Sequence, residues 1–77
     1  MKMEIKDRIA QEIGKYGFGI SLKDLVVRVY RQLDAEGYDI CILNERYLMT
    51  GERHDHTDRS FQLLKTRSKG GWTVKEF

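Results

Sequence analysis

The residues with the most obvious capacity for chemistry form a polar run between positions 51 and 60. His54 and His56 stand two apart, so an extended backbone would project both imidazoles to the same side. Together with a neighbouring carboxylate they could bind a transition metal ion. No third soft ligand lies nearby, and polar loops that contain histidine are far commoner than metal sites. We therefore expect a solvated loop, and we expect no cofactor.

A second group of residues lies in the basic C-terminal part of the chain. Residues 59–75 contain lysine and arginine but no acidic residue, and aromatic side chains are interleaved with them. Cations beside an exposed ring are one way to hold single-stranded nucleic acid. The candidate nucleic-acid-binding residues are Arg59, Lys65, Arg67, Lys69, Lys75 and Trp72. Charges on an edge hairpin also discourage aggregation, and an Arg67–Trp72 cation–π pair would shield the ring instead.

Nucleophilic catalysis has little support in the sequence. Cys41 is the only thiol, and its neighbours Ile40 and Ile42 predict a buried, inert side chain. Three glycines at positions 14, 17 and 19 fall between two predicted helices, without the preceding strand that a dinucleotide site requires. Helix termination explains them better. We expect that the protein is not an enzyme.

Length and composition predict a single small cytoplasmic domain over residues 1–77. Fourteen basic and twelve acidic residues nearly cancel, and 40% of the residues are hydrophobic, as in a folded globular protein. One cysteine excludes an internal disulfide and favours a reducing compartment. No apolar run approaches the ~20 residues that cross a bilayer, so we expect no membrane partner.

The first half of the chain predicts two helices. Apolar residues spaced three and four apart define one helix from Met1 to Tyr16, which Gly17 would end in a left-handed conformation. Ser21 is expected to cap a second helix, which ends at Gly37. Asp24 stands three residues after Ser21, as in an acidic variant of the capping box.

The second half predicts two β-hairpins. The first covers residues 38–49 with a turn at Asn44 and Glu45, which places Ile42 opposite Tyr47. The second covers residues 61–77 and places Arg67 opposite Trp72. The expected fold is therefore α+β, with two N-terminal helices packed on an antiparallel sheet in the order α-α-β-β-β-β.

The first hairpin also fits a helical pattern, since short apolar runs match both periods. A helix over residues 39–50 would give a winged-helix-like order, α-α-α-β-β. That helix would carry few side chains able to read base edges, so major-groove recognition looks poor. The β-branched and aromatic residues in this segment favour strands.

The predicted sheet leaves an apolar face that the helices do not cover. Its residues would be Cys41, Leu43, Leu48, Leu64 and Phe77. Such a face is more apolar than a monomeric sheet usually leaves in water. We therefore predict a small interaction or regulatory module that binds a protein partner or self-associates through its sheet. Nucleic-acid binding by the basic hairpin is the alternative function.

Overall fold

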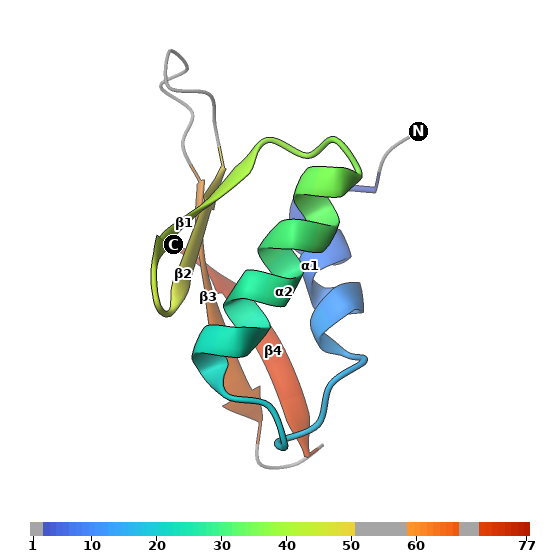
Figure 1. Cartoon of the computed structure of the whole chain (residues 1–77), viewed down its shortest axis with the longest axis vertical. Coiled ribbons are helices and arrows are strands. Elements are labelled where there is room, and N and C mark those ends of the chain that lie inside the picture. Colours follow the sequence, from blue (N-terminus) through green and yellow to red (C-terminus); the bar gives the residue numbers. More distant parts are fainter. Residues whose placement is uncertain (1–2, 51–58, 67–69) are drawn as a thin grey trace.

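The structure, a computed structural model, describes residues 3–50, 59–66 and 70–77. The helices are α1 (Ile5–Ile13) and α2 (Leu22–Ala35), and the strands are β1 (Ile40–Asn44), β2 (Tyr47–Thr50), β3 (Arg59–Thr66) and β4 (Gly71–Glu76). The strands lie in the order β1-β2-β3-β4, and each neighbouring pair is antiparallel. Both helices lie on one side of this sheet (Figure 1). The predicted α-α-β-β-β-β order is confirmed.

The alternative winged-helix-like order is wrong. The segment that would have formed its third helix instead forms β1 and β2, which pair with each other. β-branched and aromatic residues fit the pleated surface of a sheet better than a helix. The sheet gains two strands as a result, and no recognition helix exists in this part of the chain.

Helix α2 begins and ends as its sequence predicts. The Ser21 hydroxyl accepts a hydrogen bond of 3.2 Å from the backbone N–H of Asp24, which satisfies a donor that the first turn would otherwise leave free. At the other end Gly37 adopts a φ of 90°, in the left-handed region that favours glycine. The N–H of Tyr38 then reaches back to the carbonyl of Leu33, which closes a Schellman motif.

Helix α1 is shorter than predicted. It begins after Glu4, whose side chain accepts a hydrogen bond from the N–H of Lys6, and it ends with Gly14 as the C-cap in a right-handed conformation. Gly17 is therefore not the left-handed terminator that we expected, since Gly37 and Gly70 are the only described glycines with positive φ. The low helix propensity of Gly14 accounts for the early end.

The core fills the space between the helices and the sheet. It joins apolar side chains of α1 and α2 to alternate residues of the strands, where Leu48 and Phe61 are fully buried. Helix α1 packs on β4, while α2 packs on β1 and β2. Each helix therefore covers one half of the same sheet face, and neither of the two described helices lies on the opposite face (Figure 1).

The register of the first hairpin differs from the prediction by one residue. Ile42 pairs with Leu48 rather than facing Tyr47, and a bulge at Leu43 separates this pair from the turn. The turn lies over Glu45 and Arg46, so Asn44 precedes it and needs no positive φ. The Asn44 side chain accepts a hydrogen bond of 2.9 Å from the N–H of Arg46, which explains this placement.

The second hairpin is shifted by two residues. Trp72 pairs with Lys65, whereas we expected it opposite Arg67. Since side chains alternate with a period of two, an even shift keeps every residue on its predicted face. Phe61, Leu63, Trp72 and Val74 accordingly all pack in or against the core.

Candidate protein-interaction surface

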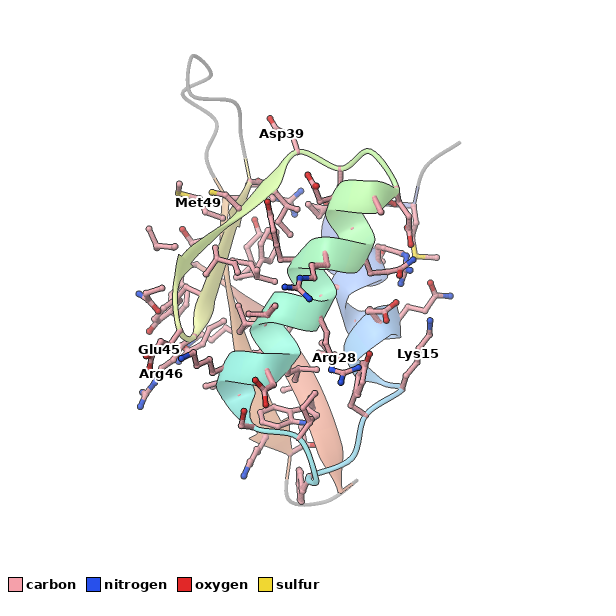
Figure 2. All side chains as sticks on the ribbon, in the orientation of Figure 1. Lys15, Arg28, Asp39, Glu45, Arg46 and Met49 are labelled. Carbon is pink, nitrogen blue, oxygen red and sulfur yellow. The ribbon has the colours of Figure 1, made fainter. Side chains whose placement is uncertain are left out.

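The side of the sheet that neither α1 nor α2 covers is a candidate site, and we call it the outer face. Its strand residues follow from the alternation of side chains and from the register, since the opposite face carries the buried residues Ile40, Leu48, Phe61, Leu63 and Trp72. Leu43, at the bulge, is assigned to the outer face because it lines a groove with Tyr47 and Phe77. They are Cys41, Leu43, Asn44, Tyr47, Met49, Ser60, Gln62, Leu64, Thr66, Gly71, Thr73 and Lys75, and Phe77 continues the last strand. Figure 2 shows Met49 projecting away from the helices.

The outer face is unusually poor in charge. One third of the chain is charged, at 34% of all residues, yet Lys75 is the single charged residue among the strand positions assigned above to the outer face. The Lys75 ammonium itself lies 5.3 Å from the centroid of the Phe77 ring, as in a cation–π contact. Few charges together with tyrosine, phenylalanine and methionine are typical of the buried centre of a protein–protein interface.

A shallow groove crosses the outer face near the tip of the first hairpin. It has a volume of about 310 Å³ and is lined by Leu43, Asn44, Tyr47, Ser60 and Phe77. The rings of Tyr47 and Phe77 pack at a tilt, with their centroids 5.7 Å apart. Leu43 and Phe77 remain 51% and 63% exposed, so the two ends of the groove present apolar carbon to solvent.

The predicted members of this face need two corrections. Leu48 was expected on it, but its side chain is 0% exposed and belongs to the core. Tyr47 and Met49 take its place, because the first hairpin is shifted by one residue. Cys41 does lie on the outer face, but it is exposed rather than buried and inert as predicted. Leu43, Leu64 and Phe77 lie on the outer face as expected.

The sequence carried one signal that could have placed the turn of the first hairpin correctly, but this signal alone would not have moved Tyr47 and Met49 to the outer face. An asparagine readily accepts a hydrogen bond from the backbone two residues later, which places it before a turn rather than inside one. Had Asn44 been assigned to that position, the turn would have moved to Glu45 and Arg46. The bulge at Leu43 has no comparable signal.

Arg59, a predicted nucleic-acid contact, is engaged within the fold. Its guanidinium donates two hydrogen bonds of 2.7 Å to Glu76 and also pairs with the carboxylate of Glu4. These hydrogen bonds lower the pKa values of both Glu76 and Glu4 below the ordinary glutamate range. The triad ties the start of α1 to β3 and β4, so the charge of Arg59 is already compensated.

Trp72 is also engaged within the fold. Its side chain is 8% exposed, and the indole N–H donates a hydrogen bond of 3.0 Å to the carbonyl of Gly17. The ring packs edge-on against Phe18, and the Lys65 ammonium lies 5.6 Å from its centroid. A base could therefore stack on Trp72 only if these contacts were broken.

The other predicted basic residues do not form one described patch. Lys65 pairs with Trp72, which faces the helices, whereas Lys75 lies on the outer face. Arg67 and Lys69 lie outside the described residues, as do His54 and His56. Among residues 3–50, 59–66 and 70–77, no group of three or more His, Cys, Asp and Glu side chains could hold a metal ion.

A half-buried ion cluster joins the two helices, with Arg8 and Glu12 buried and Glu36 exposed. The Arg8 guanidinium donates hydrogen bonds of 2.8 and 2.5 Å to the Glu36 carboxylate and lies 2.9 Å from Glu12. The hydrogen bond from Arg8, with a second from Gln32, lowers the pKa of Glu36 to about 2. Lys15 pairs with Glu12 from the solvent side. The charges of Arg8, Glu12 and Glu36 compensate one another, which is typical of a structural cluster rather than a catalytic one, although the buried Nη1 of Arg8 has an ion pair with Glu12 and no hydrogen bond.

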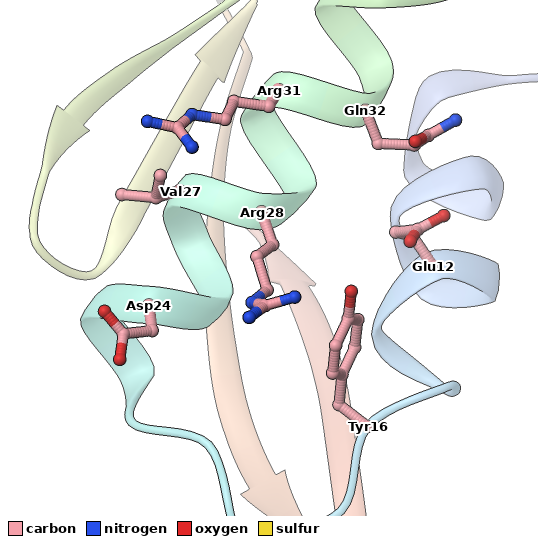
Figure 3. A pocket seen from close by; sticks show the side chains of 7 residues that line it. All are labelled: Glu12, Tyr16, Asp24, Val27, Arg28, Arg31 and Gln32. Atoms are coloured by element: carbon pink, nitrogen blue, oxygen red, sulfur yellow. The ribbon is translucent and has the colours of Figure 1, made fainter.

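A wider concavity of about 700 Å³ lies on the helical side (Figure 3). Its two arginines do not converge on a common point. Arg28 points toward the ring of Tyr16, with its guanidinium carbon 5.9 Å from the centroid, while Arg31 extends to the other side of α2. The acidic residues Glu12 and Asp24 line the same concavity. Mixed charges and diverging guanidinium groups argue against a built anion site.

Comparisons with known proteins assign no function to the chain, so a functional proposal depends on the geometry described above. No protein-family model matches the chain, and neither a curated protein nor a solved structure matches it significantly. Neither of the described helices is long and apolar enough to cross a membrane.

Proposed function

We propose that this chain is a small, non-enzymatic interaction module that binds protein through the outer face of its sheet. The observation that carries the proposal is the combination of low charge and exposed apolar side chains on that face. An antiparallel sheet with one solvated face usually alternates apolar residues with polar ones. Here both faces carry large apolar side chains, including the half-buried Tyr47, Met49 and Leu64 on the outer face.

The groove between Leu43 and Phe77 supports the same proposal. Interfaces obtain most of their binding free energy from a few large side chains seated in pockets. A groove that is lined by Tyr47 and Phe77 and flanked by exposed apolar carbon suits one apolar or aromatic side chain of a partner. Lys75 at its margin supplies a single cation, which adds specificity without crowding the surface with charge.

A cytoplasmic setting belongs to this proposal. Cys41 is a free, exposed cysteine on the outer face. An exposed thiol persists as a thiol in a reducing compartment and tends to oxidise outside it. The exposure of Cys41 therefore favours the cytoplasm more strongly than the cysteine count alone.

A comparative pull-down tests the proposal. The immobilised bait is the wild-type chain, the double variant Leu43→Lys/Phe77→Lys, or the control variant Met3→Lys. Met3 is an exposed apolar residue before α1 and lies outside the outer face. Met3→Lys therefore makes the same exchange of an exposed apolar side chain for lysine at a different place. Lysines at both ends of the groove place charge in an apolar contact, which should reduce retention of a specific partner roughly tenfold or more.

The control decides how the result is interpreted. We expect at least one protein to be retained equally by the wild type and by Met3→Lys, and to be lost from the double variant. Retention of the same proteins by all three baits would contradict a role for the outer face. Circular dichroism of each bait checks that the charges have not unfolded it.

A further inference from the structure

The two edge strands of the sheet are protected very differently. β4 carries Lys75 and Glu76 at its end, and Glu76 is held in the ion triad with Arg59 and Glu4. Charged residues on an edge are a common way to prevent pairing with another chain. β1, with the sequence Ile-Cys-Ile-Leu-Asn, has no charged residue and no proline. Within the described sheet its second side has no neighbouring strand.

The side chains of β1 are exposed on both faces of the sheet. Ile42 pairs with the buried Leu48 and so faces the helices, yet it is 38% exposed. Cys41 and Leu43 are exposed on the outer face. A partner lying flat on the outer face would cover Leu43 but would leave Ile42 in water. A strand added beside β1 would cover apolar side chains on both faces at once.

We propose that β1 pairs in antiparallel orientation with β1 of a second copy of this chain, about a two-fold axis. The bulge at Leu43 bends the end of the strand, so the pairing centres on Cys41 and Ile42. The two sheets join into one, with all four helices on one side and a continuous outer face on the other. The inference rests on the proposed function, because Leu43 belongs both to the outer face and to this edge.

A second copy suits this edge better than a charged peptide. The two-fold axis places uncharged β1 residues opposite uncharged β1 residues, so β1 itself brings no ionised group to the junction. β-branched residues that meet across strands also stabilise a pair. Within the described residues, β1 is the one edge strand without charge.

The pairing brings the only cysteines of the dimer close together. If the axis passes beside Cys41 or Ile42, the two Cys41 residues lie directly or diagonally opposite, with Cβ atoms roughly 4.5–8 Å apart. Since the chain has a single cysteine, a cross-link reports on this position alone. We expect a short bismaleimide of about 8 Å reach to convert the full chain into a covalent dimer, once Cys41 has been reduced and the reductant removed.

Sedimentation velocity of edge and face variants provides the decisive measurement. The wild type should shift from monomer to dimer between micromolar and submillimolar concentrations. Ile42→Lys and Cys41→Lys should each weaken association about tenfold or more, because each places two like charges together near the axis. Thr73→Lys should leave association unchanged, since Thr73 is exposed at the β4 end of the outer face. Two edge variants are used so that one failure to fold does not remove the test.

The outcomes separate this inference from the proposed function. A wild type that stays monomeric throughout, with no Cys41 cross-link, overturns β1 pairing. If such a monomer still loses a protein partner in the Leu43→Lys/Phe77→Lys variant, the proposed function stands alone. A dimer that dissociates in Thr73→Lys but not in Ile42→Lys would show association face to face, which overturns edge pairing but not the outer face as an interaction surface.

Discussion

At the scale of single residues, the polar side chains that were candidates for chemistry act mainly as structural contacts. Arg8 and Arg59 each bind carboxylates from other elements, and the indole of Trp72 binds the loop between the helices. The sequence could indicate that these residues are polar or aromatic, but not that their partners lie far away in the chain. Arg8 and Glu36, for example, are separated by 28 positions.

The Arg8–Glu36 pair predicts how stability depends on pH. The pKa of Glu36 is lowered from 4.5 to about 2 in the folded chain, so folding favours the ionised form. The stabilisation from this pair is therefore complete above the unfolded pKa and is lost as pH falls from about 4.5 towards 2. Glu36→Gln should lower stability at pH 7 and flatten this acid-side dependence.

Urea unfolding at a series of pH values measures this effect. Glu4 and Glu76 also have lowered pKa values, so some acid sensitivity will remain in the Glu36→Gln variant. The interpretation fails if the wild type and the variant lose stability in parallel between pH 5 and pH 2.

At the scale of elements, local signals predicted the helices more reliably than the hairpins. The cap at Ser21 and the glycine at Gly37 both act within one turn of helix, so their residues are neighbours in the sequence. Strand register depends instead on the turn and on a bulge. A shift of one residue moved Leu48 from the predicted outer face into the core, whereas a shift of two left Trp72 on its predicted side.

The existence of an apolar outer face was therefore predicted correctly, but not every residue that belongs to it. In β2, Tyr47 and Met49 point to one face of the sheet, and Leu48 and Thr50 point to the other. From the sequence, either pair could face the core. Their hydrophobicity could not decide between the two registers. The bulge at Leu43, which decides it, depends on pairing with a second strand.

The end of α2 gives a prediction that belongs to this scale. Gly37 has a φ of 90°, so Gly37→Ala should destabilise the fold by about 1–2 kcal/mol. Gly19→Ala is the matched control, because Gly19 is exposed, has no positive φ, and has no atom within 4 Å of the position that a Cβ would take. That change should be neutral or stabilising by about 0.4–1 kcal/mol, since it restricts the unfolded chain.

Thermal and urea unfolding of both variants provide the comparison. Equal destabilisation by Gly37→Ala and Gly19→Ala would mean that the left-handed cap does not contribute as described. A loss of helical circular dichroism confined to Gly37→Ala would agree with it.

At the scale of the whole molecule, the two described helices and the core occupy one side of the sheet, and neither helix lies on the other side (Figure 1). The charges follow the same division: ion pairs join α1 to α2 and, through Arg59 of β3, the start of α1 to β4, while the outer face retains Lys75 alone among its strand positions. A small domain whose paired charges lie on one side of its sheet has a weakly charged opposite side that is available for contact. This asymmetry is the physical basis of the proposed function.

Site-specific photo-cross-linking tests that claim most directly. A benzophenone amino acid replaces Thr73, which is exposed on the outer face, or Lys23, which is exposed on α2. In cells that produce the chain, irradiation should give a discrete cross-linked protein species from position 73 and none of the same size from position 23. Equal cross-linking from both positions, or cross-linking from position 23 alone, would contradict the outer face as the interaction surface.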